Sequence, residues 1–133
     1  MIRVFAIVKS AVFINAIQPY LRANGIDLIA ICQNPSAALV SYSKTEADIV
    51  LMDIHWNRDY HSISFNQLLE NLTEYQPGIK IILVSNAFEP AIDTIKKCKN
   101  IRGYFYRAMN NAFGNIVKCF SDVHCGREYF ATT

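Results

Sequence analysis

The chain has 133 residues, 52% of them apolar and 18% charged, with a formal net charge of +2. This length and composition suit one domain with a buried core and exclude a disordered chain. The net charge is too small to indicate binding of nucleic acid or a membrane surface by charge alone. The chain has neither an apolar run of roughly 18 residues nor a signal peptide. We therefore expect a cytoplasmic protein without membrane contact.

Strands and helices are expected to alternate along the chain. Apolar runs rich in β-branched residues indicate strands, and apolar residues at helical spacing indicate amphipathic helices. In chain order we expect a strand at 2–8, a helix at 10–24, a strand at 26–32, a helix at 35–43, a strand at 48–52, a helix at 65–75, a strand at 79–84, a helix at 90–99, a strand at 102–106 and a helix at 111–124.

Residues that favour helix ends support these bounds. Ser10 is a typical N-cap for the first helix, and Gly25 suits the position just after its last turn. Asn110 or Asn111 is expected to cap the last helix. Pro19 lies inside the first helix, where the missing N–H predicts a kink or a loosened turn.

The alternation predicts an α/β fold, a doubly wound sheet of five parallel strands with helices on both faces. No linker-like stretch divides the chain, so we expect one domain at residues 1–126. Residues 127–133 are expected to be a C-terminal tail or the start of a linker. In such sheets, ligands bind at the carboxyl ends of the strands.

Charged or hydroxyl-bearing residues follow the first, third, fourth and fifth expected strands. Lys9 and Ser10 follow the first, Asp53 the third, Ser85 the fourth and Arg107 the fifth. Asp53 is the single carboxylate at the end of a strongly apolar strand. We therefore expect one carboxylate, hydroxyl groups and two cations to meet at the rim where this fold class keeps its sites.

The order of these motifs resembles the receiver (CheY-like) domain of two-component response regulators, over essentially residues 1–133. The similar pieces are Leu-Met-Asp53, Leu-Val-Ser85-Asn-Ala and Gly103-Tyr104-Phe-Tyr-Arg107. Residues 116–130 are similar to the last receiver helix of regulators that carry a helix-turn-helix output domain. The resemblance implies a flavodoxin-like sheet with strand order 2-1-3-4-5, and a signalling module instead of an enzyme.

The resemblance also implies roles for individual residues. Asp53 would accept a phosphoryl group from a histidine kinase or act with another regulatory protein. Ser85 would bond the phosphoryl oxygens, Arg107 would stand where the family has a lysine, and Tyr104 would swing inward when Ser85 moves. A homodimer is a further expectation. Contact with DNA would require an output domain outside this chain, and the regulated process would then be transcription.

The sequence departs from the family at the acidic pair that binds Mg²⁺, where it has Lys9 and Ser10. Mg²⁺ requires oxygen ligands, preferably carboxylates, so we expect no metal and no other cofactor. Ala108 also stands where the family commonly has proline. Our hypothesis is a degenerate receiver in which Lys9 or Arg107 pairs with Asp53 and lowers its pKa.

Two other classes of function are compatible with the sequence. One is a protein-interaction module that works without phosphorylation. The other is a flavodoxin-like cofactor binder that uses the same rim, which visible absorbance of the purified protein would reveal. The long stretch 54–64 contains Trp56 and Tyr60, which are expected to pack over the following helix, shield Asp53 or present a contact surface.

Overall fold

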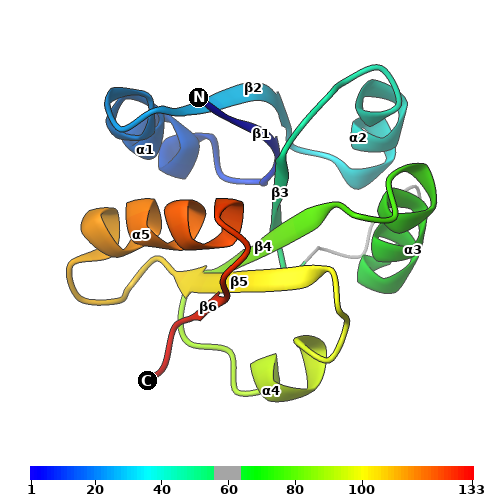
Figure 1. Cartoon of the computed structure of the whole chain (residues 1–133). Helices are drawn as coiled ribbons and strands as arrows, with labels where there is room; N and C mark the ends of the chain where they lie inside the picture. The colour runs from blue at the N-terminus through cyan, green and yellow to red at the C-terminus, as the bar shows by residue number, and fades with distance from the viewer. Residues whose placement is uncertain (56–63) are drawn as a thin grey trace.

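The computed structural model describes residues 1–55 and 64–133, and arranges them as a sheet between two layers of helices (Figure 1). The strands are β1 (Ile2–Ile7), β2 (Ile26–Cys32), β3 (Ile49–Asp53), β4 (Lys80–Ser85), β5 (Ile101–Tyr106) and β6 (Tyr129–Phe130). The helices are α1 (Ala11–Ala23), α2 (Pro35–Tyr42), α3 (Phe65–Tyr75), α4 (Ile92–Ile95) and α5 (Ala112–His124). Trp56 and Tyr60 lie outside the described residues.

The sheet has six parallel strands in the order β2-β1-β3-β4-β5-β6. The expected order of the first five strands is confirmed, but the expected strand count was wrong. The sixth strand lies inside the segment 127–133 that we expected to be a tail, and it pairs Tyr129 with Gly103 and Phe130 with Tyr104. A strand of two residues is too short to produce a sequence periodicity, so only its pairing with β5 identifies it.

Each face of the sheet has its own core. Buried residues of α1 and α5 pack on one face around Phe105 and Phe120. Buried residues of α2, α3 and α4 pack on the other around Phe5 and Tyr104. Helices on both faces explain why β3 and most of β4 are continuously apolar instead of alternating. All five residues of β3 are buried, including its last residue, Asp53.

The expected ends of α1 are confirmed. The hydroxyl of Ser10 accepts a hydrogen bond from the backbone N–H of Phe13 at 3.1 Å. Gly25 has φ +76°, the left-handed conformation that favours glycine after a helix. Helix α1 continues through Pro19. At α5, Asn111 is the N-cap residue, but it is itself left-handed (φ 51°) and its side chain makes no capping bond.

Helix α4 is shorter than expected. The pattern predicted residues 90–99, whereas the helix covers only Ile92–Ile95. Beyond it the backbone bonds change spacing: Lys97 donates to Thr94 and Cys98 donates to Ile95, three residues back instead of four. Such tight turns end an α-helix. Within the described ranges 1–55 and 64–133, no helix is long and apolar enough to cross a bilayer.

Candidate functional site

One pocket opens at the carboxyl ends of β1, β3, β4 and β5, with a volume of about 360 Å³. The residues that line it are Lys9, Ser10, Asp53, His55, Val84, Ser85, Asn86 and Arg107. The five strand-end residues that the sequence predicted to meet therefore do so. Because the strands are parallel, their polar C-terminal residues reach the same rim even though they are far apart in the chain.

Asp53 is held from two sides. The backbone N–H of Lys9 donates a hydrogen bond to its Oδ2 at 2.8 Å, and Nη2 of Arg107 donates to its Oδ1 at 3.3 Å. The Asp53 side chain is only 9% exposed. The predicted pairing of Asp53 with Arg107 is present. Lys9 instead contacts Asp53 through its backbone, and no ion pair of its ammonium is found among the described residues.

Burial raises the pKa of the Asp53 carboxyl above its ordinary value. The Lys9 N–H bond and the charges of Arg107, Lys9 and His55 all lower this pKa, but desolvation outweighs them. The predicted lowering of the pKa by a neighbouring cation is present, but the prediction did not include burial, which has the larger effect and raises the pKa. The sequence indicates which charges approach Asp53, but not how completely the fold removes it from water.

Arg107 contacts an aromatic ring as well as the carboxylate of Asp53. Its guanidinium carbon lies 4.3 Å from the centroid of the Phe13 ring, within cation–π distance. Its buried Nε has no hydrogen-bond partner among the described residues. The contact with Asp53 uses one nitrogen and one oxygen, so it is not the bidentate fork that makes such pairs strong. The guanidinium therefore has at least one N–H group, at Nε, that could donate a hydrogen bond to a ligand.

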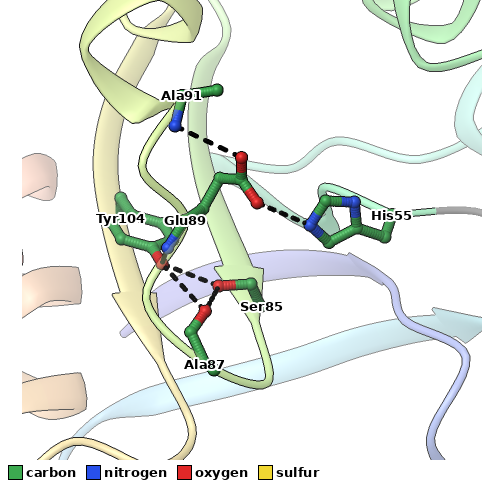
Figure 2. Close-up of polar contacts among 6 residues, drawn as sticks. All are labelled: His55, Ser85, Ala87, Glu89, Ala91 and Tyr104. Atoms are coloured by element: carbon green, nitrogen blue, oxygen red, sulfur yellow. Dashed lines mark hydrogen bonds and ion pairs between the residues drawn. The ribbon is translucent and has the colours of Figure 1, made fainter.

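Ser85 and Tyr104 form a buried hydroxyl pair beside the pocket (Figure 2). The two oxygens are 2.7 Å apart, and the Ser85 hydroxyl donates to the carbonyl of Ala87 at 2.7 Å. The Tyr104 hydroxyl therefore donates to Ser85, and it accepts the backbone N–H of Glu89 at 2.8 Å. Tyr104 is fully buried, which places its ring inward. The Ser85 hydroxyl is directed at the β4–α4 loop instead of at Asp53.

His55 and Glu89 form a contact that was not predicted from the sequence. Nε2 of His55 lies 2.9 Å from Oε2 of Glu89, and the other oxygen of Glu89 accepts the backbone N–H of Ala91 at 3.2 Å (Figure 2). This bridge connects the end of β3 to the loop that holds Tyr104. The residues are 34 positions apart and follow no shared motif, so only the fold relates them.

The pocket does not fit the Mg²⁺ ion that the family resemblance implies. Asp53 is the one carboxylate among the described residues that line it, and Lys9 and Arg107 line it too. In ranges 1–55 and 64–133, no group of three or more His, Cys, Asp or Glu side chains is placed to hold a metal. Mg²⁺ favours several oxygen ligands and is repelled by neighbouring cations. Ser10, the other substitution at the acidic pair, caps α1.

Asp53→Asn is expected to increase the free energy of unfolding at pH 7 by on the order of 1 kcal/mol. The amide oxygen can still accept from Lys9, and the group at position 53, 9% exposed, no longer carries a charge, while the Arg107 side chain that remains charged is 23% exposed and keeps contact with water. The pKa of Asp53 is raised above 3.8 in the folded protein, so at pH values above 3.8 the folded protein binds more protons than the unfolded chain. The free energy of unfolding of the wild type therefore decreases as the pH rises from 3.8 through the folded-state pKa. Urea unfolding from pH 3 to 8 should show the two proteins converging at low pH. A less stable variant at pH 7 would contradict the expectation.

No protein-family model matches the chain, and no curated protein matches it in sequence. Solved structures do match in fold. The non-phosphorylated receiver domain of the stress response regulator RcsB from Escherichia coli has a TM-score of 0.82 and 15% identity, with 98% of both chains covered. The isolated REC domain of RcsB from Salmonella enterica serovar Typhimurium, with phosphomimetic BeF₃⁻, has a TM-score of 0.81 and 14% identity, covering 98% of this chain and 93% of that one.

A two-component response regulator of the LuxR family from Aurantimonas has a TM-score of 0.79 and 15% identity, covering 96% of this chain and 87% of that one. In a structure of two RcsB dimers bound to two parallel DNAs, the match covers only 64% of the RcsB chain. At these identities the likeness establishes the fold. The chain has the CheY-like receiver fold, with β6 added at one edge of the sheet.

Proposed function

We propose that the chain is a signalling module of the response-regulator receiver type, with Asp53 as its phosphoacceptor. The observation that carries this proposal is the convergence of Asp53, Ser85 and Arg107 from three adjacent strands on one pocket. A carboxylate can act as the nucleophile in phosphoryl transfer, and a hydroxyl and a guanidinium can bind and neutralise the oxygens of the transferred group. The receiver fold supports the same conclusion.

In the transfer step, an Asp53 oxygen attacks the phosphorus of a phosphohistidine or a small acyl phosphate. The new P–O bond forms as the bond to the donor breaks, and the bonding electrons leave with the donor nitrogen or oxygen. Arg107 and Lys9 would neutralise charge on the transferring oxygens, the task that a metal ion performs elsewhere. The Arg107 guanidinium already lies 3.3 Å from Oδ1 of Asp53, so it is next to the oxygen atoms between which the phosphoryl group would be transferred.

We infer that phosphorylation changes the hydrogen bond between Ser85 and Tyr104. To bond a phosphoryl oxygen, the Ser85 hydroxyl must turn away from the Ala87 carbonyl that it now contacts. The Tyr104 hydroxyl would then lose its good acceptor and keep only the distant Ala87 carbonyl at 3.5 Å. Since an unsatisfied buried hydroxyl costs about 1–3 kcal/mol, phosphorylation would change the β4–α4 loop.

Incubation with acetyl phosphate should label the protein slowly and to the same extent with Mg²⁺ or with EDTA. Arg107 and Lys9 supply the local positive charge in both conditions, so removal of the metal should change the rate less than about threefold. Intact-mass spectrometry measures the label, and Asp53→Asn is the control that should remain unlabelled. Rapid labelling that requires Mg²⁺ would contradict the metal-free pocket, and no labelling at all would contradict the phosphoacceptor role.

A protein-interaction module without phosphorylation is the second candidate. It is favoured by two contacts already present without a phosphoryl group: Asp53 pairs with Arg107, and Ser85 bonds Tyr104. Titration with beryllofluoride, followed by NMR, separates the two candidates. Shifts at Ser85 and Tyr104 identify a phosphorylation switch, and an unchanged spectrum identifies the interaction module. A flavin site is less favoured, because Val84 is the one apolar residue among the described pocket residues.

The proposed partners follow from the proposed role as a receiver-type signalling module. A histidine kinase or another regulatory protein would act on the Asp53 pocket, and two copies of the chain would form a homodimer. Some of the matched RcsB structures contain dimers and DNA. For this chain we propose DNA contact only through an output domain outside residues 1–133. A cytoplasmic location fits this signalling role.

A further inference from the structure

The residues after α5 return along the open edge of the sheet (Figure 1). Gly126 has φ +88°, and the next residue, Arg127, donates its backbone N–H to the carbonyl of Asp122 at 2.8 Å. This turn reverses the chain so that β6 lies parallel to β5. Strand β5 would otherwise present its unpaired backbone groups at an exposed edge.

A small number of contacts hold this segment in place. The N–H of Ala131 donates to the carbonyl of Tyr104 at 3.0 Å, and the Tyr106 hydroxyl donates to the carbonyl of Thr132 at 3.1 Å. The Lys96 ammonium lies 5.2 Å from the centroid of the Phe130 ring. Tyr129 packs against one core and Phe130 against the other, but both side chains are only half-buried. A segment with two paired residues and half-buried side chains is of the kind that opens locally at low free energy.

We propose that the edge of β5 is a strand-docking surface, that residues 129–132 of the chain itself occupy it, and that this docking is coupled to the Ser85–Tyr104 hydroxyl pair. The coupling takes its biological meaning from the proposed signalling function. Release of the segment would expose a strand edge, a type of surface to which proteins add an extended segment of a partner.

The physical connection between the hydroxyl pair and the segment passes through Tyr104 and Tyr106. The side chain of Tyr104 bonds Ser85, while its backbone carbonyl holds Ala131. Its ring stacks on that of Tyr106 at 6.2 Å between centroids.

Phe88 contacts both tyrosine rings, at 6.2 and 5.7 Å between centroids. A change at the hydroxyl pair that moves Tyr104 would shift the Tyr106 ring that stacks on it. It would thereby weaken two of the contacts that hold the segment, the bond of the Tyr106 hydroxyl to Thr132 and the bond of the Tyr104 carbonyl to Ala131.

Amide hydrogen exchange of the full chain tests the coupling. Removal of one hydroxyl, in Ser85→Ala or in Tyr104→Phe, should accelerate exchange of the Ala131 amide by at least about fivefold, the lower end of typical coupling between sites. The Arg127 amide is the internal reference, because it bonds Asp122 at the end of α5 and precedes the docked segment. Its exchange should stay at the wild-type rate.

Ser10→Ala is the matched control. It removes a hydroxyl from the same pocket, but this hydroxyl caps α1 and contacts neither Tyr104 nor β5. Its Ala131 exchange should be that of the wild type after correction for global stability. Wild-type exchange of Ala131 in both Ser85→Ala and Tyr104→Phe would overturn the proposal, and so would equal acceleration in Ser10→Ala. The measurement uses no phosphoryl donor, so a failure of Asp53 to become phosphorylated would not affect it.

Discussion

Arg107→Met should lower the free energy of unfolding at pH 7 by about 2 kcal/mol. Methionine keeps an apolar contact with the Phe13 ring, so the change mainly removes the charge beside Asp53. Among the described residues, the carboxylate, 9% exposed, would then keep only the N–H of Lys9 as a hydrogen-bond donor. Removal of one member of a buried ion pair typically costs 3–5 kcal/mol, and the expected loss is smaller here because the pocket is open to water.

The loss should depend on pH and on Asp53. As the pH falls, Asp53 takes up a proton and no longer needs a counter-charge, so the difference between variant and wild type should shrink. The double variant with Asp53→Asn should recover most of the stability at pH 7. Arg22→Met is the matched control: Arg22 is 64% exposed and lies 3.9 Å from Asp27, so its loss should cost less than about 0.5 kcal/mol. Urea unfolding measures all four proteins, and equal losses in the two single variants would contradict the role of burial.

Gly103→Ala should destabilise the protein by about 2 kcal/mol. A Cβ at this position of β5 would lie 3.0 Å from side-chain atoms of Ile82, Cys119 and Val123. These atoms belong to β4 and α5 and are fully buried, so they have little room to move. The close approach of α5 to β5 therefore requires glycine here. Thermal and urea unfolding should both show the loss.

Gly78→Ala provides the comparison for Gly103. Its added Cβ would meet no atom within 4 Å. The stability of this variant should stay within about 0.5 kcal/mol of the wild type or increase slightly, because alanine reduces the freedom of the unfolded chain. A similar loss at both positions would contradict crowding under α5 as the cause of the effect at Gly103.

Much of the site could be predicted from the sequence, because a parallel sheet has a simple rule. Every strand delivers the residue after its last apolar position to the same rim. Asp53, Ser85 and Arg107 each directly follow or end such a run, so their convergence required only the strand pattern. His55 and Glu89 could not be found this way, because their contact joins two loops.

The directions of the polar groups could not be predicted from the sequence either. The sequence identified Ser85 and Tyr104 as a pair, but the direction of the Ser85 hydroxyl depends on the Ala87 carbonyl in a loop. The rise in the pKa of Asp53 depends on its burial, which the whole fold sets. Short local patterns carry no information about either.

The sequence by itself determined the alternation of strands and helices, the polar residues at the strand ends and the loss of the acidic pair at Lys9 and Ser10. These features are local, because apolar periodicity and residue type express them directly. Tertiary structure alone decided the sixth strand, the end of α4 at Ile95 and the balance of charge and burial at Asp53. The sixth strand and the burial of Asp53 depend on contacts between segments distant in the chain, which residue type and apolar spacing do not express.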